Sequence, residues 1–433
     1  MSLKSPSQVW LLAFPIILAN ITIPLLGAVD TAVMGHMETA AYLGAVAIGA
    51  LIFDYIYWGF SFLRLSTTGL AAQALGRNDV NEARAVLGRA GLIALMGALA
   101  LWVAQPFIFG LARHLIEASR DVEIFAQTYF EIRIWSAPAA LLNYALMGWL
   151  LAHKNTKAVF IQQIFINVLN VGLDLWFVWG LGLDVDGVAY ATVIAQYGGL
   201  ICGLWFVRRH FVGAWCLNDI LNKSALKSMM SMNADLFVRT VCLLSAFAWF
   251  TAQGAKLGDV VLAANAVLLQ FQQFTAYALD GFAHAVEILS AHACGKKDKA
   301  EFKSVVKRST FLAGVTALGF ALIYFVLGEQ IIALFTDIES LKDYAESYLW
   351  WVIVLPLISV WSFQLDGIYF GLTQTRVLRN MMVLSLIIYL PLSLWGLEAM
   401  GNHGLWAAFT FFMGLRAITL ISTFPSVQKK VFG

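Results

Sequence analysis

Long apolar segments recur along the whole chain and are separated by short polar stretches. A helix needs about 20 mostly apolar residues to cross the hydrocarbon core of a bilayer. Twelve segments approach or exceed that length: 9–34, 42–73, 88–112, 122–151, 158–181, 186–207, 229–254, 260–291, 309–328, 345–372, 380–398 and 403–424. The intervals between them are too short for a soluble domain. The pattern therefore predicts an all-α polytopic membrane protein with twelve transmembrane helices.

The composition agrees with a membrane location. Hydrophobic residues make up 60% of the chain, charged residues only 12%, and the mean hydropathy is +0.76, whereas soluble proteins contain about 25% charged residues. The first apolar segment is too long, and too interrupted by Pro15, Pro24 and Asp30, to be a cleavable signal peptide. The four cysteines and seven histidines show no ligand-type spacing, so neither a zinc site nor a disulfide framework is expected.

Lysine and arginine are distributed unevenly between the two sides of the predicted membrane protein. With the N-terminus inside, twenty of the 28 basic residues fall in cytoplasmic segments and four fall within helices. The opposite loops hold the remaining four: Arg113, Arg120, Lys256 and Lys342. Basic residues are enriched in cytoplasmic loops. The bias predicts a multi-pass protein of the cell inner membrane with both termini in the cytoplasm.

The chain contains an internal duplication. One constant offset aligns Gly76-Arg77-Asn78-Asp79 with Gly295-Lys296-Lys297-Asp298 and Gly148 with Gly367, and nearly the same offset aligns Gly187 with Gly404. Six predicted helices separate equivalent points, so both halves have the same orientation. The expected domains are an N-terminal six-helix lobe carrying the coupling site (1–207), a cytoplasmic linker (208–228) and a C-terminal six-helix lobe (229–433). Transporters built from such repeats bind substrate near the midplane.

Asp30, near the end of the first apolar segment, is the most informative residue of the sequence. An aspartate in the middle of a membrane costs about 2.5–3.5 kcal/mol, so such residues usually line an aqueous cavity and bind ions, protons or cationic substrates. The duplication aligns Asp30 with Trp249. The site is therefore expected to be asymmetric, with its acid in the first half.

Polar residues also form a stripe on one face of the fifth predicted helix. Its members, spaced 4, 3 and 4 residues apart, are Gln163, Asn167, Asn170 and Asp174. Residues at this spacing share a helix face. The amides alone could serve as hydrogen bonds between helices, whereas a buried Asp174 needs a cation, a proton or a cavity. Thr192 and Gln196, one turn apart on the sixth helix, are expected to face the stripe.

The depths of Asp30 and Asp174 suggest one shared cavity. Asp174 lies about 24 Å from the cytoplasmic end of its helix at 1.5 Å per residue, and Asp30 lies at least as far along the first helix. Two carboxylates a few ångströms apart do not both ionise readily, so the pair would hold a proton near neutral pH. Loading a proton or Na⁺ there would compete with a cationic substrate. The alternative is that Asp30 is a solvated helix end.

A second group of ionisable residues lies in the second half of the chain. Asp280, His284 and Glu287 fall on one face of the eighth helix, and Asp366 in the tenth helix shares the Leu-Asp-Gly triplet of Asp280. This secondary polar network is interpreted equally well as an inner gate or as a structural network, with Arg64 and Arg239 as possible partners. Asp54 in the second helix is a further candidate without an evident partner.

Several motifs together resemble the multidrug and toxic compound extrusion (MATE) family, DinF-type branch. They are Pro15 followed by Gly27-Ala-Val-Asp30-Thr-Ala-Val-Met-Gly35-His, the repeated Gly-x-x-Asp loops, Asn170-x-x-x-Asp174, and Asn402-His-Gly-Leu-Trp406. The resemblance covers essentially the whole chain. It implies two six-helix lobes forming a V and antiport of organic cations or amphiphiles against H⁺ or Na⁺.

The resemblance also implies roles for individual residues. The ion-coupling group would be Asp30, Asn170, Asp174 and Thr192, with Tyr129 as a further member, and Pro15 would be the bend of the first helix. Branches with coupling acids in the seventh helix find no match, because 229–254 contains only Asp235, close to its cytoplasmic end. This departure favours protons, although Na⁺ at Asp30 and Asp174 stays open.

The predicted function is a cation-coupled multidrug efflux antiporter that works by alternating access and is not an enzyme. Asn167, Gln163, Gln196 and Asp54 are candidates for the substrate cavity. We expect a monomer in the lipid bilayer, with organic cations or amphiphilic drugs as substrates, no nucleic-acid partner, no cofactor and no resident metal. The alternative is a flippase for a lipid-linked or anionic substrate, which would favour a cavity rich in Arg and Lys. An intramembrane enzyme or a channel fits the pattern less well.

Overall fold

The computed structural model describes residues 7–35, 40–115, 119–208 and 216–433, without the side chains of 7, 23–35, 40 and 115. All regular elements of this part of the chain are helices. They form two compact units, Leu18–Met229 and Met230–Gly433 together with Met1–Ile17. Below they are called the N-terminal unit and the C-terminal unit.

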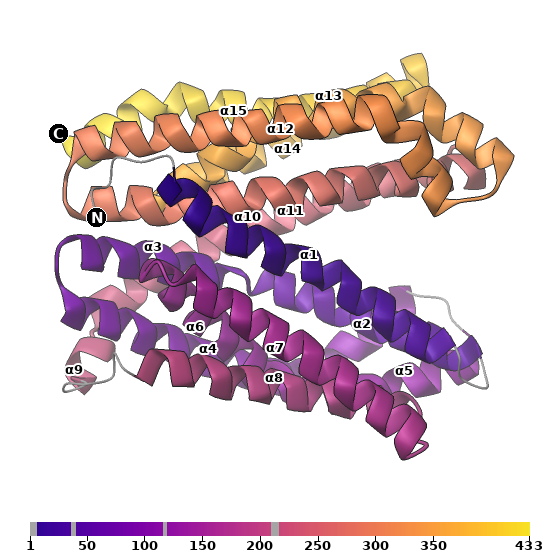
Figure 1. Ribbon diagram of the computed structural model, residues 1–433, viewed down its shortest axis with the longest axis horizontal. Coiled ribbons are helices and arrows are strands. Elements are labelled where there is room, and N and C mark those ends of the chain that lie inside the picture. The colour runs from indigo at the N-terminus through magenta and orange to yellow at the C-terminus, as the bar shows by residue number, and fades with distance from the viewer. Residues whose placement is uncertain (1–6, 36–39, 116–118, 209–215) are drawn as a thin grey trace. The chain divides into compact units, whose positions relative to one another are not determined.

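The N-terminal unit contains the helices of the first half. Its helices are α1 (Ser7–Gly35, from Leu18 onward), α2 (Ala40–Gly59), α3 (Phe62–Gly76), α4 (Val80–Leu115), α5 (Arg120–Arg133), α6 (Ala137–Ala152), α7 (Thr156–Leu175), α8 (Val185–Val207) and α9 (Leu217–Ile220). A 3₁₀ turn (Ile134–Ser136) joins α5 to α6, and a π-helical turn (Trp176–Gly180) extends α7. Within the unit α6 packs against α3 and α4, and α7 packs against α8 (Figure 1).

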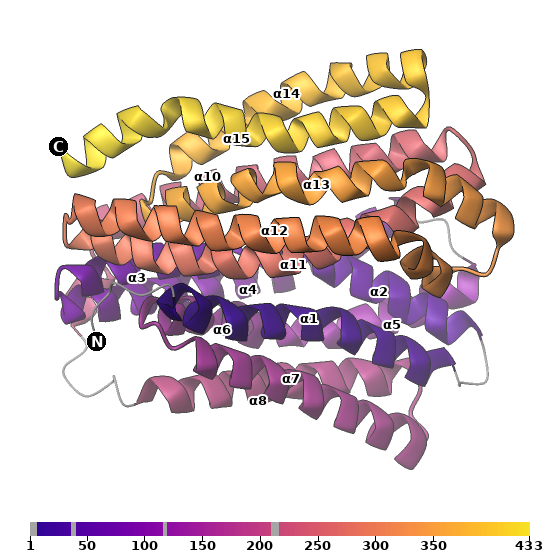
Figure 2. The same ribbon diagram turned by 45° about the horizontal axis from the view of Figure 1, so that its top comes forward.

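The C-terminal unit repeats this plan with longer, less interrupted helices. They are α10 (Lys223–Ala255), α11 (Asp259–Gly295), α12 (Lys299–Phe335), α13 (Glu339–Gly371), α14 (Thr375–Met400) and α15 (Asn402–Phe432). Here α13 packs against α11, α12 and α15, and α14 packs against α15 (Figures 1 and 2). Large buried aromatic side chains fill the core, among them Phe250, Phe271, Trp406, Phe409 and Phe412.

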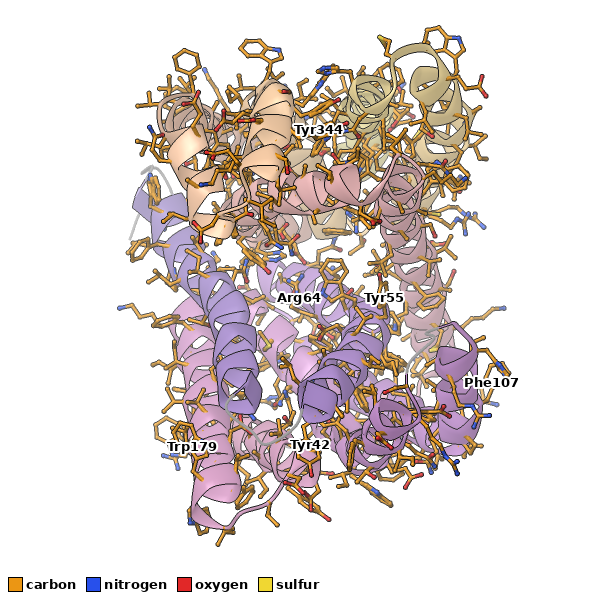
Figure 3. All side chains as sticks on the ribbon, turned by 90° about the vertical axis from the view of Figure 1, so that its right-hand side faces the viewer. Tyr42, Tyr55, Arg64, Phe107, Trp179 and Tyr344 are labelled. Atoms are coloured by element: carbon orange, nitrogen blue, oxygen red, sulfur yellow. The ribbon has the colours of Figure 1, made fainter. Side chains whose placement is uncertain are left out.

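The predicted count of membrane spans is confirmed. Ten helical stretches of the described residues are long and apolar enough to cross a membrane, and the other two predicted spans, 9–34 and 260–291, coincide with the helices α1 and α11. Exposed aromatic side chains such as Phe107 and Trp179 project outward from the helices (Figure 3). The helices extend beyond the apolar runs: 309–328 was expected where α12 covers Lys299–Phe335. The apolar segment gives the part of the helix that would lie in the bilayer, and the backbone remains helical in the charged residues before it.

The internal duplication is also visible in the backbone. Helix α4 begins at Val80 and α12 begins at the equivalent position of the second half, Lys299. The loops before them contain Asn78 and Lys297, which both have positive φ angles, 62° and 55°. Asp79 then caps α4 by accepting a hydrogen bond from the amide three residues on (3.0 Å), as Asp298 does for α12 (2.8 Å). The repeated loop sequence therefore builds the same turn twice.

Two aligned glycines permit the same close helix contact in both halves. A Cβ on Gly148 would lie 2.5 Å from the carbonyl oxygen of Arg64, and one on Gly367 would lie 2.2 Å from that of Ala283. Arg64 and Ala283 are themselves equivalent positions of the duplication. Each unit therefore brings two helix backbones together at a point that has no room for a side chain.

Substitution of Gly367 by alanine is expected to destabilise the protein by about 1–3 kcal/mol, because the new methyl group would overlap a backbone atom. The measurement is the thermal unfolding midpoint of the full chain in detergent. Gly314→Ala on α12 is the matched control, since its Cβ would meet no atom within 4 Å. That control should keep or slightly raise the midpoint, because alanine is the better helix former. Equal midpoints for the two variants would contradict the close contact.

The contacts divide the chain differently from the expected domains 1–207, 208–228 and 229–433. The first residues, through Ile17, belong to the C-terminal unit, and the later boundary lies between Met229 and Met230, inside α10. The Trp10 ring packs edge-on against Phe282, with centroids 5.1 Å apart. Ile17 also lies close to Gly281, where a Cβ would come within 2.3 Å of it. The packing of the first turns of α1 on α11 could not be predicted from the position of the linker in the sequence.

Candidate functional site

The polar stripe of α7 contacts α1 through Asn167. Its Nδ2 donates to Thr22 Oγ1 at 2.9 Å, and its Oδ1 accepts from Gln163 Nε2 at 3.0 Å. Thr22 Oγ1 in turn donates to the carbonyl oxygen of Ala19 at 2.7 Å. The predicted spacing of the stripe therefore gives a continuous chain of hydrogen bonds from α7 to α1 in the N-terminal unit.

The same stripe contacts α8, as the sequence predicted for Thr192. Asn170 Nδ2 lies 3.4 Å from Thr192 Oγ1, which itself donates to the carbonyl oxygen of Val188 at 3.0 Å. Asn170 is 3% exposed and Asp174, one turn further, is 0% exposed. A carboxylate so completely buried is costly without compensation. Asn170 thus joins α7 to Thr192 of α8, and Asp174 is buried one helical turn beyond it.

Asp30, the central residue of the predicted site, lies on α1, but its side chain is outside the described ones, as is that of Pro24. The backbone nevertheless fixes how far along α1 this position lies. Helices α1 and α7 run in the same direction (Figure 1), and Thr22 is level with Asn167 through their hydrogen bond. Position 30 is eight residues beyond Thr22, about 12 Å, and Asp174 is seven beyond Asn167, about 10.5 Å.

In the second half of the chain, the side chains at the positions equivalent to 30 and 174 are both described. The duplication makes Trp249 and Ser393 the equivalents of positions 30 and 174. Trp249 Nε1 donates to Ser393 Oγ at 2.8 Å. The C-terminal unit thus joins α10 to α14 through the side chains at the positions equivalent to 30 and 174.

Gln196 was expected to face the stripe, but its hydrogen bonds lead elsewhere. Asn143 Nδ2 donates to the Gln196 carbonyl oxygen at 3.0 Å and to its Oε1 at 3.2 Å. Asn143 Oδ1 accepts from Gln162 Nε2 at 3.1 Å, and Gln162 also donates to the carbonyl oxygen of Gly199. The interpretation of Gln196 is corrected accordingly: it joins a buried amide network of α6, α7 and α8. Sequence reasoning missed Asn143 and Gln162, since isolated amides carry no spacing signal.

Tyr129 and Asp54 both lie near Arg133, which the sequence analysis did not select. Arg133 Nη1 donates to the hydroxyl of Tyr129 at 2.6 Å, and its guanidinium carbon lies 4.8 Å from the ring centre of Phe53. Tyr129 is 2% exposed. Asp54 is exposed and within electrostatic reach of Arg133. An arginine inside a membrane segment is itself a signal of function, so Arg133 could have been selected from the sequence as a member of this group.

In the C-terminal unit the acid of α13 is held between two arginines. Asp366 Oδ2 accepts hydrogen bonds from Arg239 Nη2 and, at 2.6 Å, from Arg416 Nη2. All three side chains are buried, and Arg239 also lies over the ring of Phe370. The predicted pairing with Arg239 is confirmed, whereas Arg64 belongs to the N-terminal unit. Arg416 was missed as a partner because only packing brings α15 to this place.

The remaining members of the secondary polar network lie on α11. His284 Nδ1 is 3.1 Å from Glu287 Oε2, and Glu287 is fully buried. Asp280 is within electrostatic reach of Arg416. Asp235, the acid of the seventh span, pairs with Arg379. These carboxylates face basic partners in the same unit, which is the geometry of a structural network.

Metal ligation has no visible basis in the described part of the chain. No group of three or more His, Cys, Asp or Glu side chains there is placed to hold a metal ion. A site for Na⁺ involving Asp30 falls outside that search.

Comparison with known proteins identifies the family. A family model described as MatE matches residues 15–176 and 236–395, one stretch in each half of the chain. The chain belongs to the MATE family. Its DinF-type character is supported by DNA damage-inducible protein F of Escherichia coli K12, which is 40% identical over 421 residues, 96% of this chain and 91% of that protein.

More distant MATE relatives share the whole length. The probable multidrug resistance protein NorM of Acinetobacter baylyi is 22% identical over 96% of this chain and 94% of its own. The crystal structure of a MATE protein in the bent conformation superposes with a TM-score of 0.91 at 17% identity, covering 100% of this chain and 98% of that one. This MATE chain therefore has the twelve-helix fold of two six-helix lobes.

Proposed function

We propose that this MATE protein is an antiporter that exports organic cations or amphiphilic toxic compounds in exchange for protons, by alternating access. Its relatives include a probable multidrug resistance protein, which supports efflux of drug-like compounds. The observation that carries the proposal is the register of α1 and α7. It supports a depth of position 30 similar to that of the buried Asp174. In the second half, the side chains at the equivalent positions, Trp249 and Ser393, are hydrogen-bonded.

A pair of adjacent carboxylates at positions 30 and 174 would explain how ion and substrate compete. Like charges in contact disfavour double ionisation, so Asp30 and Asp174 would share a proton and change their total charge by one when it leaves. An organic cation binds well to the deprotonated pair and poorly to the protonated one. Asn170 and Thr192, in contact at 3.4 Å, would orient the acid of α7, and Tyr129 is proposed as a further member of the coupling group.

The charge distribution of the C-terminal unit supports a coupling site confined to the first half. Asp366 already accepts hydrogen bonds from two buried arginines, and Asp235 is paired with Arg379. Carboxylates neutralised in this way have little tendency to bind a further cation. The N-terminal unit instead buries Asp174 completely, with Asn170 one helical turn away.

Pro15 is proposed as the bend point of α1. Proline lacks the amide hydrogen of a helical residue and weakens the helix one turn before it. The boundary between the two units follows closely, between Ile17 and Leu18. A bend here would let the part of α1 beyond Leu18 move with the N-terminal unit while the first turns stay packed on Phe282.

Gln163, Asn167 and Asp54 are proposed to line the substrate cavity of the N-terminal unit, with α7 supplying the amides. The positive-inside distribution of lysine and arginine supports cytoplasmic termini and an inner-membrane location. We propose a monomer as the working unit, since one chain already contains both copies of the six-helix repeat.

The proposal is tested with the full chain reconstituted in liposomes and loaded with ethidium, a flat organic cation. A pH gradient alone is expected to drive ethidium transport well above the rate of protein-free liposomes. A Na⁺ gradient at equal pH should give no increase. Transport driven only by Na⁺ would overturn proton coupling, and no ethidium transport under either gradient, with efflux of an anionic dye instead, would favour the anionic-substrate alternative.

A further inference from the structure

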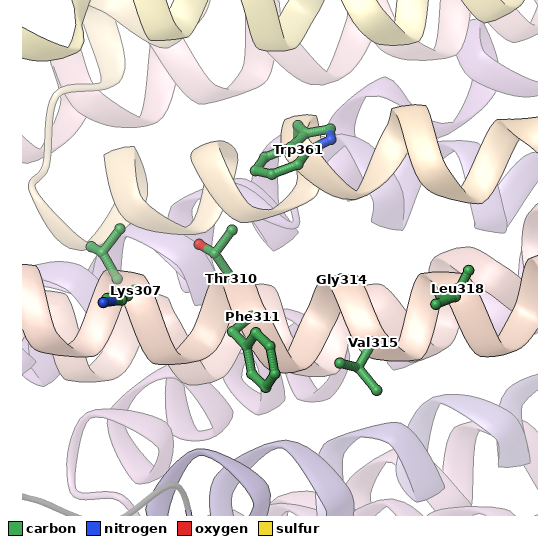
Figure 4. A pocket seen from close by; sticks show the side chains of 8 residues that line it. Lys307, Thr310, Phe311, Gly314, Val315, Leu318 and Trp361 are labelled. Carbon is green, nitrogen blue, oxygen red and sulfur yellow. The ribbon is translucent and has the colours of Figure 1, made fainter.

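An exposed, mostly apolar groove of the C-terminal unit is made by residues that the proposed transport site does not use. It has a volume of about 550 Å³ and lies between α12 and α13. Its lining is apolar except at one end, where Lys307 and Thr310 stand, and Trp361 of α13 forms the other wall (Figure 4). Gly314 keeps the floor low, because nothing lies within 4 Å of the place its Cβ would take.

A row of lysines leads into this groove along α12. Lys299, Lys303 and Lys307 follow one another at four-residue intervals, which places them on one helix face. All three side chains are exposed, and none takes part in the salt bridges found among the described residues. Phe311 and Leu318 continue toward the middle of the helix and line the groove. Along α12, the positively charged lysines are therefore followed directly by the apolar part of the groove.

The first half of the chain lacks this arrangement at the equivalent positions. Lys307 corresponds to Gly88, whose surface is covered by Ile220 of α9: a Cβ there would lie 2.7 Å from the Ile220 side chain. Gly314 corresponds to Leu95, which carries a large side chain where the second half has none. The lysine row and the glycine of the groove therefore occur in the second copy of the duplication and not in the first, so helix packing alone does not require them.

We propose that this groove binds an anionic phospholipid. One acyl chain would lie between Phe311, Leu318 and Trp361, and the phosphate would rest against Lys307, with Lys303 nearer the water. Lys307 is eight residues into α12, about 12 Å from its start, while α12 is some 25 Å longer than the hydrocarbon core requires. This depth matches the phosphate level of one leaflet. Basic pockets between membrane helices at this level bind anionic headgroups.

The test is native mass spectrometry of the full chain titrated with phosphatidylglycerol, reading the apparent Kd of the first bound lipid. Loss of one lysine near the membrane surface is expected to weaken binding about fivefold in Lys307→Gln. Gly314→Leu, which fills the slot but keeps every lysine, should also lose the lipid. Arg84→Gln is the matched control, because Arg84 is the first-half equivalent of Lys303, and its Kd should stay that of the native chain.

Three outcomes would overturn the proposal. Equal affinity for phosphatidylcholine would remove the role of charge, and equal weakening in Lys307→Gln and Arg84→Gln would remove the role of the groove. Displacement of the lipid signal by millimolar inorganic phosphate would assign the site to free phosphate. Thermal unfolding of each variant checks that it is folded, and Lys307, being exposed, can be replaced without disturbing the core.

Discussion

Asp30→Asn is expected to reduce transport driven by a pH gradient to the rate of protein-free liposomes. The asparagine keeps the shape of the side chain but cannot release a proton. Without a second carboxylate to share a proton with, Asp174 would stay ionised around neutral pH, so the site would no longer change its charge. Protons would then no longer compete with the substrate cation for the site, so the pH gradient could not drive transport of the cation. The measurement is ethidium transport in proteoliposomes at equal protein density.

Two variants serve as controls for this loss. Asp30→Glu keeps an ionisable carboxyl and should retain measurable proton-driven transport. Asp121→Asn removes an exposed acid at the start of α5 in the same unit and should transport like the native chain. Native rates in Asp30→Asn, or an equal loss in Asp121→Asn, would show that Asp30 has no special role.

Asp366→Asn is expected to destabilise the folded protein by about 3–5 kcal/mol, the usual cost of breaking a buried ion pair. The carboxylate lies between Arg239 and Arg416, and its loss leaves two buried guanidinium groups facing one neutral amide. The measurement is the thermal unfolding midpoint of the full chain in detergent. A decrease of several degrees is expected.

A second substitution distinguishes charge repulsion from a simple packing defect. Adding Arg416→Met to Asp366→Asn removes one of the two facing cations, so the midpoint should recover part of the loss. Asp343→Asn makes the same chemical change at an exposed position of α13 and should leave the midpoint unchanged. If the double variant is less stable than Asp366→Asn alone, the arginines do not repel each other and the structural account of this cluster is wrong.

Most of the fold could be predicted from the sequence because the bilayer sets the length of every apolar run. The duplication predicted that the loops at Asn78 and Lys297 are alike. Both loops have a left-handed residue at this position and an aspartate cap after it. The place of the first turns of α1 could not be predicted. It depends on the packing of Trp10 on Phe282, a tertiary contact without a sequence pattern.

The site was predicted where helical spacing alone decides it. Asn167, Asn170 and Asp174 share a face of α7, and Thr192 is found beside Asn170 as expected. The partner of Gln196 was not predicted, because the rotation of α6 and α8 about their axes decides which amide it meets. Arg133 and Arg416 are two of the four basic residues that the sequence places within helices. Their side-chain partners were not predicted, because these partners depend on how the helices pack.

The central claim is that substrate and proton compete for the Asp30 and Asp174 pair of the N-terminal unit. The most direct test is proton release on substrate binding, followed with a pH indicator in weakly buffered detergent solution near neutral pH. The native chain is expected to release protons when ethidium is added to saturation, and both Asp30→Asn and Asp174→Asn to release none, while Asp343→Asn behaves as the native chain. Undiminished proton release in Asp30→Asn would contradict the account.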